Sequence, residues 1–196
     1  MIFRNNAFTR YPDHYHLSRV RDMADGLTTY GTDLGFTSTE IDFFVDYAKT
    51  FENILFALDE EKADVHKKYA KLKNCEGEAR AQYSGCEKLI IGEIAVATKD
   101  IATYLENRFD INKGLPPSQG GFIKVADSML KGYDDMTVEH PDILLPAPPF
   151  ESLRTKLNNF KITIAEIDEA VSQKLETTAQ KNIERENGNR YLNRVF

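Results

Sequence analysis

The longest regular pattern of apolar residues in this chain begins at Ile41 and repeats every seven residues. The steps alternate between three and four, and thirteen of the fifteen positions from Ile41 to Ile90 are apolar, against about six expected from a 41% apolar composition. Positions on the opposite face are polar with one exception. A two-sided heptad pattern of this length predicts a long α-helix that packs along a coiled-coil-like seam.

Two polar residues, Lys62 and Glu76, interrupt this seam. A polar residue at a seam position either fixes the register and the number of partner helices, or it marks a place where the seam opens to solvent and a lysine extends outward. Both interpretations stay open. The stretch expected to contact a partner consists of Phe51, Leu55, Leu58, Lys62, Val65, Tyr69, Leu72, Glu76 and Tyr83.

The heptad register predicts one continuous helix over about 38–107, roughly 100 Å long at 1.5 Å per residue. The alternative is a hairpin that turns at Ser84-Gly85, but the register crosses Gly85 without a change of phase. After Ile90 the spacing shifts in a way that locally unwinds a supercoil. Cys75 and Cys86 would lie about 16 Å apart on this helix, too far for a disulfide, so two free thiols are expected.

The long helix is preceded by a start signal, GFTSTEIDFF over 35–44. Thr37 is placed to cap the first amides, and Glu40 is placed to reach back to the amide of Thr37, which together form a capping box. The letters T-x-x-E-I-D occur again at Thr163 and Glu166. Both copies therefore predict a helix N-terminus after a tight turn, worth about 1 kcal/mol of helix stability.

The similarity between the two copies extends upstream, since seven of nineteen residues match between 27–45 and 153–171. We interpret this as an internal duplication, each copy consisting of a short helix, a turn and a capped longer helix. The alternative is that two capping boxes look alike because few residues can start a helix.

The remaining segments predict shorter elements. A first helix of about 15 residues ends near Gly31, another short helix stops at Gly132, and four prolines over 139–149 predict an extended connector. The predicted fold is all-α, an elongated bundle with a second, shorter helical hairpin, and the predicted domains are 1–110, 111–148 and 149–196. Because these helices are much shorter than the long one, part of the seam is expected to remain uncovered.

Composition and charge narrow the classes of function. The 196 residues carry a formal net charge of −6, which argues against a nucleic-acid-binding protein and against binding to anionic membranes. The chain has no apolar run long enough to span a bilayer, no signal peptide at its start and no N-x-S/T sequon. These features predict a cytoplasmic protein, in a cell or in an infected host.

Candidate chemistry is sparse. His14 and His16 form a His-x-His pair that could chelate a metal ion if the backbone were extended, and no second cluster has ligand spacing. We find no phosphate-binding loop, no di-iron motif and no recognisable nucleophile with its base. Neither a cofactor nor catalytic residues are expected.

Uncovered apolar seam is typical of proteins that associate. We therefore expect a non-enzymatic scaffold or assembly component, part of a viral or phage particle or another large complex, that binds a second copy of itself or another protein. The alternative is an enzyme or small-ligand binder with a pocket between the two helical units.

Overall fold

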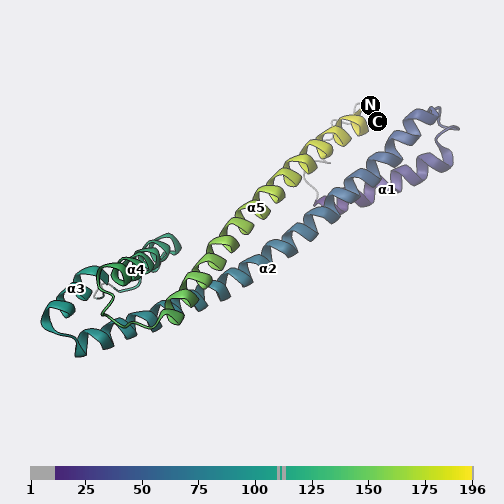
Figure 1. Ribbon diagram of the computed structural model, residues 1–196. Coiled ribbons are helices and arrows are strands. Elements are labelled where there is room, and N and C mark those ends of the chain that lie inside the picture. The colour runs from purple at the N-terminus through teal and green to yellow at the C-terminus, as the bar shows by residue number, and fades with distance from the viewer. Residues whose placement is uncertain (1–11, 110, 112–113, 196) are drawn as a thin grey trace. The chain divides into compact units, whose positions relative to one another are not determined.

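The structure is a computed structural model that describes residues 12–109, 111 and 114–195, with side chains as far as residue 190. Every regular element in the described ranges is an α-helix, as Figure 1 shows. The predicted all-α class is confirmed. The five helices are α1 (Asp13–Tyr30), α2 (Ser38–Val96), α3 (Lys99–Phe109), α4 (Gln119–Glu139) and α5 (Ala147–Val195).

The chain forms two compact units. Unit 1 combines the chain up to His66 with the chain from Glu169 onward, and unit 2 consists of Lys67–Asp168. Both α2 and α5 contribute residues to each unit. Unit 1 thus joins two distant stretches of sequence, whereas each of the predicted domains 1–110, 111–148 and 149–196 is a continuous stretch.

Unit 1 contains α1, the first part of α2 and the last part of α5. Its core is formed by apolar side chains of α1 and α2 that are at most 7% exposed: Val20, Ala24, Leu27, Phe44, Tyr47, Ala48 and Phe51. On the α5 side, Thr177 donates to the Glu61 carboxylate at 2.7 Å, and Gly188 lies against the ring of Tyr47. Residue numbers fall along α5 as they rise along α2, so the two helices are antiparallel in this unit.

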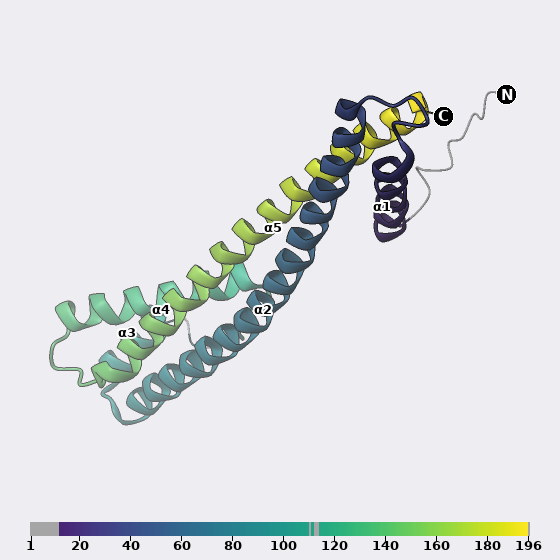
Figure 2. The ribbon, with the colours of Figure 1, turned by 90° about the vertical axis from the view of Figure 1, so that its right-hand side faces the viewer.

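Unit 2 contains α3, α4 and the adjoining parts of α2 and α5 (Figure 2). The ring of Phe122 on α4 contacts Tyr83 of α2 and Phe160 of α5, each with ring centroids 6.1 Å apart. Tyr133 stacks on Phe150 at 4.0 Å. These aromatic contacts join α2, α4 and α5 into one core, because each ring buries a large apolar area.

The first capping box is confirmed. The amide of Thr37 donates to Glu40 Oε2 at 2.8 Å, and the amide of Glu40 donates to Thr37 Oγ1 at 3.3 Å. The pKa of the Glu40 carboxyl is lowered because the carboxylate accepts from the amide and the hydroxyl of Thr37. Phe36 and Ile41, which occupy the two staple positions, both pack against the core of unit 1.

Substitution of Thr37 by alanine is expected to lower the free energy of unfolding by about 1 kcal/mol, because an amide of the first turn loses its acceptor. Thr39→Ala is the matched control, since Thr39 is exposed in the same turn and is not the cap residue. Urea denaturation followed by circular dichroism measures both. Equal effects of the two substitutions would show that the box does not stabilise α2.

The long helix is continuous past Gly85, as predicted, and the two cysteines are free thiols. It ends at Val96 rather than near Asn107, which corrects the predicted boundary. The carbonyl of Thr98 accepts the amide of Ala102 at 2.8 Å and begins α3, and threonine is a favoured residue at that position. The break lets α3 pack beside α4 and bury Leu105 and Phe109.

The second capping box does not form, and this prediction was wrong. Thr163 lies inside α5, fully buried, and its hydroxyl donates to the carbonyl of Asn159 at 2.8 Å. Glu166 pairs instead with Lys71 of α2 at 2.8 Å. The segment 153–171 is therefore continuous helix, whereas 27–45 contains a turn. The predicted second hairpin is replaced by a single helix of 49 residues.

Two further boundaries differ from the prediction. Helix α4 does not stop at Gly132 but continues to Glu139. Gly132 lies where α4 meets α3, and a Cβ atom there would lie 3.1 Å from the Phe109 ring. In the proline-rich segment only 140–146 is non-helical. Pro148 and Pro149 lie in the first turn of α5, where a missing amide proton removes no helical hydrogen bond.

Candidate functional site

The predicted seam of α2 consists of two rows of residues with different surroundings. We call one the inner row (Phe44, Phe51, Leu58, Val65, Leu72, Ala79 and Cys86). The inner row is buried at every position. Phe44 and Phe51 are buried in the core that α2 forms with α1. In unit 2 the antiparallel helix α5 lies along α2, since Lys71 pairs with Glu166 and Gln82 donates to the Pro149 carbonyl. The expectation that only short helices face the seam was wrong, because α5 has 49 residues.

The outer row (Ile41, Ala48, Leu55, Lys62, Tyr69, Glu76, Tyr83 and Ile90) is covered only towards its ends. Ala48 is buried in the core that α2 forms with α1, and Tyr83 is buried beside Phe122 of α4. Between them, Leu55 and Glu76 are half-buried, Lys62 is exposed and Tyr69 is 51% exposed. Part of the predicted seam thus remains open, although on one row only.

The two polar seam residues differ in their roles. Lys62 is exposed and pairs with its neighbour Asp59 at 2.8 Å, which agrees with the interpretation that the seam opens to solvent there. Glu76 accepts from Arg80 at 2.8 Å and from Gln119 at 3.1 Å. It therefore fixes the start of α4 against α2 within unit 2.

Arg80 extends this contact to the loop before α4. Its guanidinium donates to the carbonyls of Pro116 and Pro117 at 2.9 and 3.2 Å, and it lies over the Phe122 ring at 4.5 Å. A guanidinium can satisfy carbonyl and carboxylate acceptors at once because its donors point in several directions in one plane. The group is structural, since every partner belongs to the same unit.

The predicted metal candidates are not brought together. His14 and His16 lie in the first turns of α1 rather than in extended backbone, so their side chains leave the helix on different faces. His14 is exposed and His16 is only 1% exposed. Within the ranges that the structure describes, no three histidine, cysteine or acidic side chains are placed to hold a metal ion.

His16 instead belongs to a polar cluster that we call the α1 anchor (Asp13, His16, Tyr47, Lys181 and Arg185). The two oxygens of Asp13 accept from Lys181 at 2.7 Å and from Arg185 at 2.6 Å. His16 Nε2 lies 2.9 Å from the Tyr47 hydroxyl. These contacts join the start of α1 to α2 and α5 inside unit 1.

Burial perturbs the protonation equilibria of two members of the anchor, His16 and Tyr47. Desolvation lowers the pKa of His16 to about 4, with a further contribution from the charge of Arg185, while Asp13 acts in the opposite direction. Burial also raises the pKa of the Tyr47 phenol, and the charge of Glu184 adds to this. At neutral pH both side chains are therefore uncharged and act as hydrogen-bonding partners.

A cleft of about 530 Å³ opens beside the anchor in unit 1. Leu55 and Leu58 line it together with two ion pairs, Asp13–Lys181 and Asp59–Lys62. The charges of the cleft thus neutralise one another, which leaves little net field for recognising a charged ligand.

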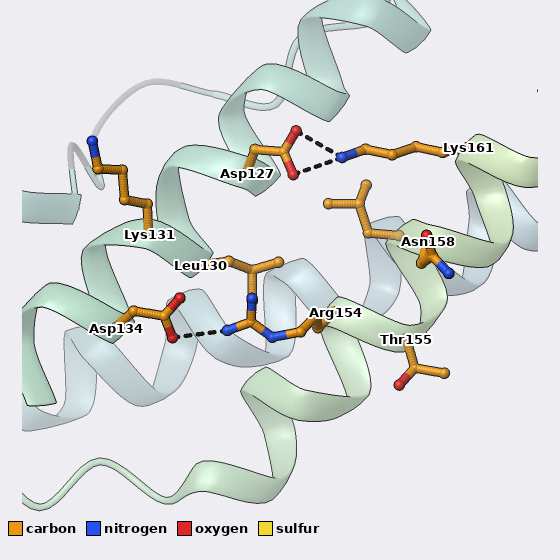
Figure 3. A pocket seen from close by; sticks show the side chains of 9 residues that line it. Asp127, Leu130, Lys131, Asp134, Arg154, Thr155, Asn158 and Lys161 are labelled. Atoms are coloured by element: carbon orange, nitrogen blue, oxygen red, sulfur yellow. Dashed lines mark hydrogen bonds and ion pairs between the residues drawn. The ribbon is translucent and has the colours of Figure 1, made fainter.

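Unit 2 has a groove of about 620 Å³ between α4 and α5, seen closely in Figure 3. Two ion pairs cross it from α4 to α5: Asp127 with Lys161 and Asp134 with Arg154, each at 2.8 Å. Lys131 extends away from both pairs in Figure 3. Because the crossing charges are paired and partly exposed, the groove resembles an ordinary charged helix surface.

Cys86 is not suited to act as a nucleophile. Cys86 is fully buried, its Sγ donates to the Pro149 carbonyl at 3.4 Å, and burial raises the pKa of the thiol to about 11. A thiol that stays protonated at neutral pH is a poor nucleophile.

Over the described residues, no helix combines the length and the apolar character needed to cross a bilayer.

Sequence reasoning missed the α1 anchor. Along the sequence, Asp13 is 168 positions from Lys181 and 172 positions from Arg185. A lysine and an arginine four residues apart on a polar helix do not by themselves indicate such a contact. The only local signal was the density of polar and aromatic residues at 13–16, which we interpreted as a metal candidate.

No family model, curated protein or solved structure matches this chain.

Proposed function

We propose that this protein is a non-enzymatic structural component that associates through its helices, as a homo-oligomer, in a cytoplasmic assembly. The observation that supports it is the open part of the outer row. Tyr69 belongs to a heptad seam whose other apolar members are buried or half-buried, yet half of its own surface is exposed. Exposed apolar side chains on a regular seam favour helix–helix association.

Other exposed side chains support the same proposal. Phe56 of α2 is 63% exposed, and Leu175 and Ile183 of α5 are 64% and 58% exposed. In unit 2, Val96, Val138 and Leu144 are each about four-fifths exposed. Single exposed apolar residues are ordinary, so the seam position of Tyr69 carries more weight than their number.

The catalytic alternative has less support. In both the cleft and the groove the crossing charges are paired within the chain, and the most perturbed groups, His16 and Tyr47, are buried in the α1 anchor. An acid–base residue has to reach its substrate, and neither of these two side chains lines a described cavity.

Analytical ultracentrifugation over a range of protein concentrations tests the proposal. We expect a mass above that of one chain, and we expect Tyr69→Lys to shift the equilibrium towards monomer by at least ten-fold, since a buried charge without a partner disfavours an interface. The matched control is Asn74→Lys, which adds the same charge at an exposed position on the polar face of α2.

The proposal is contradicted if the wild-type chain remains monomeric at every concentration, or if the two lysine variants weaken association equally. A monomer that retains a bound small molecule through purification would instead support the alternative of a ligand-binding protein.

A further inference from the structure

Besides the ion pair of Arg21 with Glu52 of α2, two sets of contacts hold helix α1 in unit 1. Along its length, Val20, Ala24 and Leu27 pack against α2 in the core of the unit. At its first turns the contacts are polar, because Asp13 and His16 meet α5 and α2. The second set contains a titratable side chain in an apolar setting, so its strength depends on protonation.

His16 is enclosed by groups from three helices. The Tyr47 hydroxyl and the edge of the Phe51 ring, 5.0 Å away between centroids, lie on the α2 side. The charged neighbours are Asp13 from α1 itself and Arg185 from α5. The Nδ1 atom is buried and has no hydrogen-bond partner among the described residues.

This geometry suits the neutral imidazole and not the imidazolium. A protonated ring carries two N–H donors, and the structure offers a described acceptor only at Nε2, where Tyr47 lies. The added charge would also be desolvated and would face the guanidinium of Arg185, while Asp13 already has both oxygens engaged by Lys181 and Arg185. A buried charge without an adequate partner is strongly unfavourable.

We propose that α1 is an acid-sensitive latch: protonation of His16 in mildly acidic medium detaches α1 from unit 1 and uncovers the apolar side chains of α2 beneath it. The side chains uncovered include Phe44, Ala48 and Phe51, which are at most 6% exposed when α1 is in place. The latch does not depend on the association proposed above, because it requires only the groups of one chain.

The direction of the effect follows from proton linkage. In detached α1 the imidazole regains a pKa near 6.5, whereas in the attached helix burial lowers the pKa of His16 to about 4. The detached form therefore binds an extra proton between these two values. Attachment is strongest above pH 6.5 and weakens as the pH falls through this window.

The size of the effect is measurable. With those two pKa values, the equilibrium constant for detachment rises roughly ten- to thirty-fold between pH 7.5 and pH 5. The other three histidines are less enclosed, since His14 and His66 are exposed and His140 is half-buried. None of these three lies among the residues that form the core beneath α1.

Amide hydrogen exchange read by mass spectrometry tests the latch. After correction for the intrinsic pH dependence of exchange, protection of α1 is expected to fall by about ten-fold or more from pH 7.5 to pH 5. Protection of α4, in the other unit, serves as the internal reference and is expected to change by less than about two-fold. Imidazole resonances give a second measurement, in which His16 is expected to take up its proton over the same pH range in which α1 loses protection.

The decisive variant is His16→Leu combined with Tyr47→Phe, because removing both partners leaves no buried hydroxyl unsatisfied. We expect it to abolish the pH dependence of α1 protection, while His14→Leu, at an exposed position in the same turn, preserves it. The latch is refuted if wild-type α1 keeps its protection at pH 5, if α1 and α4 lose protection together, or if the double variant responds as the wild type does. If the variant does not fold, the imidazole titration of the wild type decides.

Discussion

Replacement of Phe122 by alanine is expected to lower the free energy of unfolding by about 3–5 kcal/mol, the range for a buried aromatic ring. The side chain is fully buried, and its ring contacts Tyr83 and Phe160 from two other helices. The guanidinium of Arg80 also lies over it at 4.5 Å. Truncation would leave a cavity between α2, α4 and α5 that these rigid rings cannot fill by small movements.

The matched control is Phe56→Ala, because Phe56 on α2 is 63% exposed. Its truncation is expected to change the stability by less than about 0.5 kcal/mol, as is usual for surface positions. Denaturation by urea, followed by circular dichroism, compares the two variants. If Phe56→Ala is as destabilising as Phe122→Ala, the assignment of core and surface on these helices is wrong.

Substitution of Gly188 by alanine is expected to destabilise the protein by about 1–2 kcal/mol, although alanine is the better helix former. A Cβ atom at this position would overlap Cζ and Oη of Tyr47. Tyr47 cannot move freely, because it is 6% exposed and its hydroxyl lies 2.9 Å from His16. Because the overlap is with a ring that cannot yield, the cost lies in the upper part of the overpacking range of about 1–3 kcal/mol. It therefore exceeds the gain of about 1 kcal/mol in helix propensity.

The control is Gly77→Ala, which is expected to stabilise the protein. Gly77 lies in α2, and no atom comes within 4 Å of a Cβ atom built there, so the variant is expected to gain up to about 1 kcal/mol. Thermal unfolding of both variants measures the difference in sign. A stabilising effect at Gly188 as large as that at Gly77 would show that α5 does not pack closely against Tyr47.

The open part of the outer row and the α1 latch concern the same helix in different ways. Lys62 and Tyr69 are exposed whether or not α1 is attached, since α1 packs against an earlier part of α2. Detachment of α1 would add Phe44, Ala48 and Phe51 to the apolar surface available on α2. Association measured at pH 7.5 and at pH 5 therefore distinguishes two cases. It is equally strong at both pH values if only the open part of the outer row associates, and stronger at pH 5 if the side chains beneath α1 also take part.

Local patterns in the sequence determined the elements that depend on neighbouring residues. The heptad repeat from Ile41 to Ile90 identified α2 and its apolar seam, because seven-residue periodicity places side chains on one face wherever the backbone is helical. It did not distinguish the buried inner row from the outer row. The box at Thr37 and Glu40 marked the start of α2, since the preceding residues contain Gly35 with a φ of 85° and the chain has to turn there. The sequence also placed the end of α1 near Gly31, and the structure has it at Tyr30.

Only the tertiary structure decided at which positions a local start or stop signal does not begin or end a helix. Thr163 and Glu166 have the letters of a capping box, but no residue before them forces the chain out of the helix, and burial of Phe160, Thr163 and Ile167 continues the contact of α5 with its neighbours. A capping box stabilises a helix start only where the backbone enters the helix. Likewise, Gly132 does not end α4, because a glycine facing Phe109 allows two helices to approach closely.

The α1 anchor shows most clearly what the sequence by itself did not determine. Asp13 meets Lys181 and Arg185 only because α2 and α5 are antiparallel, which depends on the whole path of the chain between them. That path also decides that His16 is enclosed while His14, two residues earlier, is exposed. Periodicity places a side chain on a face of its own helix, but the energy of that side chain depends on which helix the fold brings to that face.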